Sequence, residues 1–287
     1  MPAGQRPLVR RRLRNELRDE RERARKSQND VALAMEWSLS KVIRLEAGQV
    51  GISANDMKAL LSLYEVSDPE RVTFMTGLAR AARQQSAWWS RYRDIYPDDH
   101  LEFLGYEDEA ATIMLFETIC IPGLLQTEEY ARALMEADPG SQSKVDELIE
   151  IRSARQRHVL GRDDPPDLVA VLDEAALRRR VGDADTTAEQ LRHIVNVAGM
   201  PNVTVQVVPF ERGAYVGMSG PFLIFEFSDP NDAPVLQKDG VPWNMLLRDN
   251  KPVVDQHRKA FDCIRGAALD PERSLEAIGK IAEECTG

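Results

Sequence analysis

Four side chains within five residues have the chemistry needed to bind a nucleic acid: Ser40, Lys41, Ile43 and Arg44. If this stretch is helical, Ser40 and Arg44 share one face because they are four residues apart, and Lys41 and Ile43 flank that face. A hydroxyl, an ammonium, a guanidinium and an apolar group beside a thymine methyl can reach phosphates and base edges in a major groove. The pattern predicts contacts with double-stranded DNA, in which Arg44 reads guanine and Lys41 holds phosphate.

Catalytic groups are harder to assemble from the rest of the chain. Asp173 and Glu174 follow a predicted strand, where carboxylates could act as acid and base, but no partnered histidine, nucleophile or metal-spaced ligand stands near them in the sequence. The glycine-rich stretch 213–220 precedes a predicted strand rather than a helix, which indicates a hairpin loop and not a phosphate-binding loop. We therefore expect no enzymatic activity.

Cysteine and histidine spacing predicts neither a disulfide framework nor a metal site. The three cysteines are odd in number and far apart, and the four histidines are scattered. A reducing cytosol is the default environment for such a chain. No apolar run approaches the roughly 18 residues of a membrane span, and none follows the basic N-terminus as a secretory signal requires. We expect a cytoplasmic protein without cofactor, metal or membrane partner.

The candidate DNA-contacting residues need two closely packed helices to position them, and residues 28–45 have that pattern. Val42 and Leu45 are expected to face the core from the second helix, and the small Ala32 allows close approach of the first. Trp37 is expected to fill the turn between them. Glu36 departs from the pattern, because glycine is usual where the backbone is left-handed. We interpret the segment as a helix-turn-helix; the alternative is an unrelated helical hairpin.

Both helices begin after residues that suit a helix start. Ser27 and Ser38 are predicted N-caps of helices over 28–35 and up to residue 46. Gln28, at the start of the first helix, is expected to clamp the DNA backbone or a base edge, and Ser38 completes the predicted DNA-binding set. One recognition helix reads only a few base pairs, so we expect a homodimer on an inverted-repeat operator.

Charge divides the chain into two unlike parts. The whole chain carries −10, but residues 1–96 hold 18 lysines and arginines against 12 acidic residues, a net charge of +6. Residues 97–287 hold 19 against 35, a net charge of −16. This asymmetry indicates that the first part is suited to a polyanion and that the second part binds something else.

Periodicity also predicts two domains. Residues 1–83 are expected to form an all-helical helix-turn-helix domain with the start of a linker helix over 69–92. Residues 84–287 are expected to form an acidic α+β domain that binds an effector or partner, so the chain is mainly α plus α+β. Its small sheet is predicted near 168–172, 203–208, 222–227 and 235–238, among several helices, one of them capped by Thr187.

Five residues are candidates for an effector or partner site. Trp88, Trp89 and Tyr92 are more typical of a packed seam between the linker helix and the second domain, but they could line a pocket or an interface. Residues 121–127 are expected to form a structural turn into a capped helix, and the alternative is that Gln126 and Tyr130 face an effector.

Several runs resemble known regulators. Residues 27–32 and 38–48 resemble the XRE-type (Cro/CI-like) helix-turn-helix regulators, in which the equivalent of Gln28 holds phosphate or base and the second helix reads DNA. Residues 88–92, 121–133, 172–177, 201–210 and 220–224 resemble the effector domain of the actinobacterial WhiJ-type, antitoxin-like transcriptional regulators. That resemblance implies a developmental or metabolic regulator, often paired with a small protein encoded nearby.

The residues and the resemblance together predict a sequence-specific DNA-binding transcriptional regulator whose C-terminal domain binds an effector or small partner protein. Two readings of the acidic domain stay open. It is either a sensor of a small molecule, or an antitoxin-like module that neutralises a small partner protein while the chain regulates its own operon.

Overall fold

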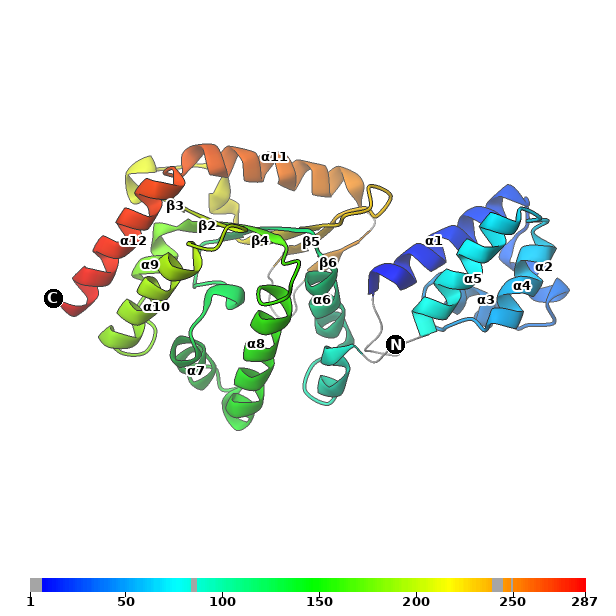
Figure 1. Ribbon diagram of the computed structural model, residues 1–287, viewed down its shortest axis with the longest axis horizontal. Helices are drawn as coiled ribbons and strands as arrows, with labels where there is room; N and C mark the ends of the chain where they lie inside the picture. The colour runs from blue at the N-terminus through cyan, green and yellow to red at the C-terminus, as the bar shows by residue number, and fades with distance from the viewer. Residues whose placement is uncertain (1–6, 84–86, 239–244, 249) are drawn as a thin grey trace. The chain divides into compact units, whose positions relative to one another are not determined.

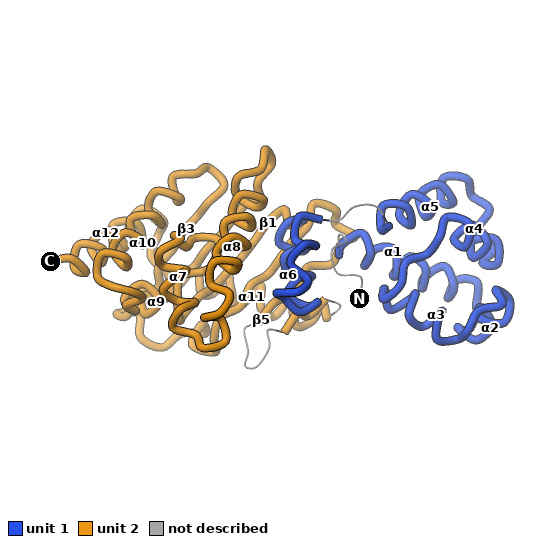
Figure 2. The backbone as a smooth tube through the Cα atoms, turned by 90° about the horizontal axis from the view of Figure 1, so that it is seen from below, with its two compact units in different colours: residues 1–109 blue, residues 110–287 orange. Residues whose placement is uncertain are grey.

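The computed structural model describes residues 7–83, 87–238, 245–248 and 250–287 (Figure 1). The chain divides into two compact units, residues 1–109 and residues 110–287, which Figure 2 colours separately. In the described residues the first unit is all-helical and the second combines helices with a sheet. The predicted fold class is confirmed. The sequence predicted that the DNA-binding domain ends at residue 83. This functional boundary differs from the boundary between the compact units, and it stays a prediction.

The first unit is built from helices that begin at well-capped positions. Ser27, Ser38 and Ser53 each accept a hydrogen bond through the hydroxyl from the backbone N–H three residues later. Such a cap stabilises a helix start by about 1 kcal/mol. The predicted caps Ser27 and Ser38 are confirmed. The helices are α1 (Pro7–Arg23), α2 (Gln28–Ala34), α3 (Leu39–Glu46), α4 (Ala54–Leu63), α5 (Pro69–Arg83) and α6 (Asp98–Glu109).

The predicted helix over 69–92 is wrong in its last part. Helix α5 ends at Arg83, and Ala87 is extended, with φ −59° and ψ 156°. A separate 3-10 helix, η1 (Trp88–Tyr92), follows and contacts α6. A Cβ on Gly105 of α6 would lie 2.4 Å from the Pro7 ring and 3.0 Å from the Trp89 ring. The break lets the tryptophan pack this closely, and burial of so large a ring outweighs another helical turn.

The second unit is organised by one sheet of six strands in the order β3-β2-β1-β4-β5-β6. Strands β1, β2 and β3 are mutually parallel, so their carboxyl ends meet at one edge, while β4, β5 and β6 pair antiparallel. Strands β1 and β6 were not expected from the sequence. The strands are β1 (Thr112–Glu117), β2 (Asp167–Asp173), β3 (Val203–Val208), β4 (Phe222–Glu226), β5 (Val235–Lys238) and β6 (Met245–Leu247).

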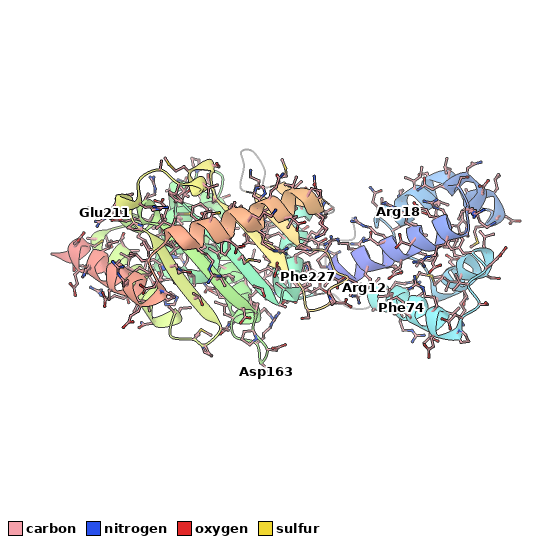
Figure 3. The ribbon with its side chains drawn as sticks, turned by 90° about the horizontal axis from the view of Figure 1, so that it is seen from above. Arg12, Arg18, Phe74, Asp163, Glu211 and Phe227 are labelled. Atoms are coloured by element: carbon pink, nitrogen blue, oxygen red, sulfur yellow. The ribbon has the colours of Figure 1, made fainter. Side chains whose placement is uncertain are left out.

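Helices cover both faces of this sheet. Figure 1 shows α11 on one side of the strands and α7, α8 and α10 on the other, and Figure 3 shows α11 crossing the strands. Beneath α11, Phe222 and Ile224 of the sheet pack with Phe261 and Ile264 of the helix. The helices of this unit are α7 (Glu128–Ala137), α8 (Val145–Val159), α9 (Glu174–Arg178), α10 (Ala184–Val197), α11 (Lys251–Ala267) and α12 (Pro271–Thr286).

The predicted cap of α10 is also wrong. Asp183, not Thr187, caps the helix by accepting a hydrogen bond from the backbone N–H of Thr186. Thr187 lies inside the first turn, is buried, and donates its hydroxyl proton to carbonyl oxygens of Val181 and Asp183. A threonine can fill either role, because its hydroxyl bonds backbone groups at helix starts and inside helices alike.

Candidate nucleic-acid interface

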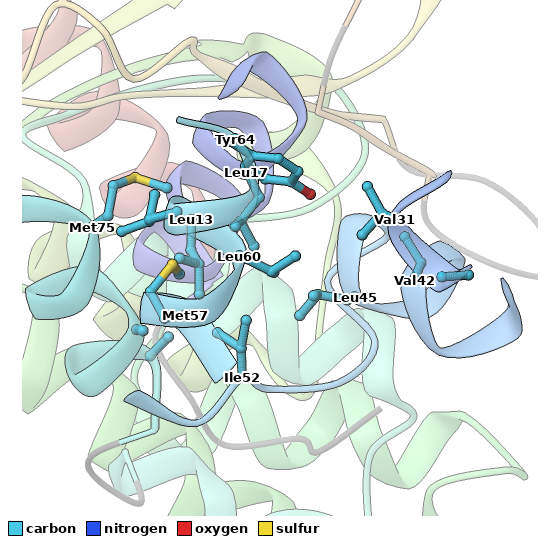
Figure 4. Close-up of a cluster of buried hydrophobic side chains, with 14 residues drawn as sticks. Leu13, Leu17, Val31, Val42, Leu45, Ile52, Met57, Leu60, Tyr64 and Met75 are labelled. Atoms are coloured by element: carbon cyan, nitrogen blue, oxygen red, sulfur yellow. The ribbon is translucent and has the colours of Figure 1, made fainter. Parts of the chain in front are cut away.

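The inner side of the helix-turn-helix is a continuous apolar core (Figure 4). Val42 and Leu45 of α3 are 1% and 5% exposed, and Val31 and Ala32 of α2 are equally enclosed. They pack with Leu17 from α1 and with the apolar side of α4 and α5. The predicted inward residues of both helices are confirmed. This packing fixes which side of α3 is left to face outward.

The turn between α2 and α3 holds a strained residue. Glu36 has φ 54°, in the left-handed region that side chains other than glycine rarely adopt. This conformation costs about 1 kcal/mol. Trp37 follows, half-buried against the core, and the ammonium of Lys41 lies 3.5 Å from the centroid of its ring. The turn therefore has the backbone and the aromatic filler that the sequence predicted.

A buried charge network joins the first three helices. Glu46 at the end of α3 is 3% exposed and accepts hydrogen bonds from Arg21 Nε at 2.6 Å and Nη2 at 3.1 Å. It also accepts one from Gln28 Nε2 at 2.8 Å. The bond to Glu46 is the main cause that raises the pKa of Arg21 above its usual value. Gln28, a predicted DNA contact, is thus positioned by α3, and its amide oxygen accepts no hydrogen bond from the residues that the structure describes.

The outer side of α3 is exposed, and several of its side chains make no hydrogen bond or ion pair among the described residues. Ser40 and Arg44 are exposed, Ile43 is 45% exposed, and the Arg44 guanidinium has no hydrogen bond or ion pair within the residues that the structure describes. Lys41 is less free, because its ammonium is 3.6 Å from Asp56 as well as above Trp37. Ser38 is exposed, but its hydroxyl caps α3. The six predicted residues therefore lie on α2, on α3 and at the N-cap of α3. Gln28, Ser38 and Lys41 already have a partner within the protein. The side chains of Ser40, Ile43 and Arg44 have none among the described residues.

The predicted effector residues of the first unit form an aromatic cluster. Trp88 meets Trp89 and Tyr92 edge-on, with ring centroids 5.6 Å and 6.2 Å apart. Trp89 and Tyr92 are buried, and the indole N–H of the half-buried Trp88 donates to Asp108 at 3.0 Å. The structure brings the three together as packing groups within the first unit, against α6, and the predicted seam between a linker helix and the second domain stays a prediction.

The two predicted effector residues of the second unit lie inside it. Gln126 is 4% exposed, donates to the carbonyl of Ile121 at 2.6 Å and accepts a hydrogen bond from Arg152. Tyr130 is 1% exposed, and its hydroxyl oxygen accepts from the backbone N–H of Ile121 at 3.3 Å. Burial raises the pKa of Tyr130 to about 12. Both side chains hold the turn before α7, so a role toward a ligand would require this turn to open.

The two carboxylates that follow β2 are likewise engaged. Asp173 caps α9 and accepts a hydrogen bond from the Tyr215 hydroxyl, which comes from the glycine-rich stretch 213–220. Burial, and then this bond, raise the pKa of Tyr215 well above its usual value. Glu174 pairs with Arg178 and accepts from the backbone N–H of Phe210. The glycine-rich stretch joins β3 to β4, but the predicted hairpin is wrong, because β2 and β1 lie between these two strands in the sheet and β4 pairs with β1 and β5.

The described residues offer neither a metal centre nor a membrane-spanning helix. No group of three or more histidine, cysteine, aspartate or glutamate side chains is arranged to hold a metal ion there. No helix in the same residues combines the length and apolar character needed to cross a bilayer.

The comparisons with known families agree with this geometry. Residues 12–74, which include α2 and α3, match the family described as Helix-turn-helix domain. Residues 101–280, more than half of the chain, match the family described as Domain of unknown function (DUF5753). The chain belongs to the DUF5753 family. No curated protein and no solved structure matches it. The predicted helix-turn-helix is confirmed, and DNA is the partner that such a domain indicates.

Some surface features of this DUF5753 protein were not found from the sequence. Leu33 is 72% exposed on α2 and Leu39 is 42% exposed at the start of α3, beside the predicted contacts. Arg25, which precedes α2, has φ 52° and an exposed side chain that makes no hydrogen bond or ion pair among the described residues. The exposure of these three side chains depends on how α1, α2 and α3 pack together. The only signal in the sequence is the arginine-rich stretch that contains Arg25.

Proposed function

We propose that this DUF5753 protein is a sequence-specific DNA-binding transcriptional regulator of the XRE type. The observation that carries the proposal is the division of α3 into two sides. Val42 and Leu45 are buried, whereas Ser40, Ile43 and Arg44 are exposed. A recognition helix needs this arrangement, because its inner side must hold the helix in place while its outer side enters the major groove.

Base reading is assigned chiefly to Arg44. Its guanidinium has no competing partner within the described part of the chain, so no ion pair has to be broken before it binds guanine O6 and N7. Gln28, held by Glu46, clamps a phosphate or an adjacent base edge, and Lys41 contacts phosphate after leaving Asp56. The net charge of +6 on residues 1–96 attracts the DNA backbone.

The second unit is proposed to receive an effector or a small partner protein, as in the actinobacterial WhiJ-type regulators that the chain resembles. The unit, residues 110–287, holds 19 lysines and arginines against 29 acidic residues, and this net charge of −10 disfavours contact with phosphate, which supports a role other than DNA binding. Regulation then requires the bound molecule to prefer one of two states that differ in DNA affinity. We propose no catalytic role, since Asp173 and Glu174 both serve as structural hydrogen-bond acceptors.

We also propose that the protein binds its operator, an inverted repeat, as a homodimer. Two recognition helices related by a two-fold axis double the number of base pairs that are read. For the complex with the operator, light scattering should show twice the monomer mass of 32.3 kDa plus the mass of the duplex. A monomer both free and bound to a minimal operator would contradict this expectation.

The test of the main proposal is the variant Arg44→Ala. An operator is first selected from random duplexes with the full-length protein, and binding is then measured by fluorescence anisotropy at fixed salt. Loss of a bidentate contact to guanine costs about 1–3 kcal/mol, so operator affinity should fall roughly 5- to 150-fold. Affinity for random DNA should fall much less.

Arg80→Ala is the matched control. Arg80 is an exposed arginine of α5 whose side chain makes no hydrogen bond or ion pair in the part of the chain that the structure describes, so its removal changes the net charge equally without breaking a contact. We expect it to leave base preference unchanged. If Arg44→Ala alters operator affinity no more than Arg80→Ala does, the outer side of α3 is not the reading face.

A further inference from the structure

The second unit contains a pocket of about 410 Å³ at the carboxyl ends of two parallel strands. Glu174 directly follows β2, and Pro209 directly follows β3, and both line the pocket together with one side of α12. Ligands in open α/β sheets bind outside the carboxyl ends of the strands, usually where the strand order reverses, which in this sheet is between β1 and β4. The pocket lies beside β2 and β3 instead, so its lining residues are what indicate a ligand. The volume lies in the range of small-molecule sites.

One wall of the pocket is a closed network of charges. Arg178 donates from Nε to Glu174 at 2.5 Å and from Nη1 to Glu284 at 2.7 Å. The second oxygen of Glu174 accepts the backbone N–H of Phe210 at 2.7 Å. These groups satisfy one another, so they shape the wall and offer little attraction to a ligand.

Three other charged groups of the lining have no such partner. The side chains of Glu211, Arg273 and Lys280 make no hydrogen bond or ion pair among the residues that the structure describes. Arg273 and Lys280 both project from α12, seven residues apart and therefore on one side of the helix. Glu211, labelled in Figure 3, comes from the 3-10 helix η4 (Phe210–Arg212). The pocket thus presents two unpaired cations and one unpaired carboxylate.

The floor between these charges is apolar. Val207 of β3 and Ile281 of α12 line the pocket and are 1% and 4% exposed, and Leu269 from the corner before α12 lies beside them. The backbone N–H of Leu269 donates to the carbonyl of Val207 at 2.8 Å, which holds this corner against the strand. A ligand that fits must therefore bring an apolar group as well as charge.

The balance of charge selects the ligand class. The lining contains three carboxylates and three cations, so a simple anion at Arg273 and Lys280 would also face the repulsion of Glu211. A ligand that carries a positive as well as a negative charge would be attracted to Glu211 through its positive group. We propose that the pocket binds a small zwitterion with an apolar side chain, a free amino acid or a dipeptide, with its carboxylate at Arg273 and Lys280 and its ammonium at Glu211.

This site deepens the proposed effector role, and in that respect rests on it. The pocket itself is tested without DNA. The full-length protein is titrated by calorimetry and ligand-observed NMR with L-leucine and L-leucyl-L-leucine at up to about 10 mM. The N-acetylated and C-amidated forms of both probes remove the ammonium and the carboxylate in turn.

We expect at least one free probe to bind and both of its blocked forms to bind about two- to fivefold more weakly, the effect of one exposed ion pair. Arg273→Ala and Lys280→Ala should each weaken the free probe by a similar factor, and Glu211→Gln should abolish the preference for the free over the acetylated form. Lys259→Ala on α11, an exposed lysine outside the pocket, is the matched control and should change nothing. All of these side chains are exposed, and near-ultraviolet circular dichroism verifies that the variants are folded.

Absence of binding by the unaltered protein overturns the proposal, as does equal binding of free and acetylated probes or binding that ignores the three pocket variants. Operator affinity is then measured with and without the bound probe. If the probe binds but operator affinity is unchanged, the pocket is a ligand site that has no role in regulation. If Arg44→Ala fails to change operator affinity, the proposed DNA reading is wrong, and the proposal for the pocket is unaffected.

Discussion

Removing the charge of Glu46 should lower the free energy of unfolding of the helix-turn-helix. The variant Glu46→Gln keeps the size of the side chain but turns one of its two acceptor oxygens into a donor. Glu46 is 3% exposed and receives three hydrogen bonds, two from Arg21 and one from Gln28. After the substitution at least one of these donors faces another donor, and the Arg21 charge loses its buried partner.

The magnitude follows from burial. Breaking a buried charge pair by altering one partner costs about 3–5 kcal/mol. Arg21 is 12% exposed and keeps its bond to the carbonyl of Lys26 at 2.9 Å, which places the cost near the lower limit, at about 3 kcal/mol. Amide exchange in α3 through opening of the unit should then be about a hundredfold faster.

Hydrogen exchange followed by mass spectrometry on the full-length protein measures this directly, with peptides from α3 compared to peptides from β2 in the other unit. The matched control is Glu22→Gln. Glu22 lies 3.6 Å from the same arginine but is 59% exposed, so its loss should cost less than about 1 kcal/mol. Equal effects of the two variants on α3 would refute the reasoning that burial makes Glu46 the dominant partner.

Two further substitutions separate contact from folding. Lys41→Ala should weaken operator and random DNA alike and reduce the slope of log affinity against log salt by about one, measured by anisotropy over a salt series; an unchanged slope would remove Lys41 from the phosphate contacts. Val42→Asp should unfold the first unit, because Val42 is 1% exposed and a buried carboxylate there has no partner. Thermal melting monitors that loss, and a variant that melts normally yet fails to bind DNA would contradict the inward assignment.

Local signals in the sequence were sufficient to predict the helix starts and the core-facing residues of the helix-turn-helix in the first unit. Ser27 and Ser38 cap their helices as predicted, and Val42 and Leu45 face the core, because capping and helical periodicity depend on residues only a few positions apart. The left-handed residue Glu36 could be placed for the same reason. What could not be foreseen was that Gln28 is bonded to Glu46, since eighteen residues and a change of helix direction separate them.

The second unit shows where local reasoning fails. Strand β1 has no turn signals that set it apart, and it is defined by its neighbours β2 and β4, which lie far along the chain. A short apolar run cannot be distinguished from a buried helix segment by periodicity alone. The pocket could not be predicted either, because Glu211, Arg273 and Lys280 meet only through the packing of α12 beside β3.

The two-sided character of α3 also affects how such a protein can change over evolutionary time. Substitutions at Ser40, Ile43 and Arg44 alter exposed atoms that hold nothing else in the described structure together, so they cost little folding stability. Duplicated copies of the gene could therefore acquire new operators through changes at these three positions while every buried residue stays the same. The same property makes α3 suitable for engineering, because a set of side chains chosen for another sequence can replace the outer side without redesign of the core.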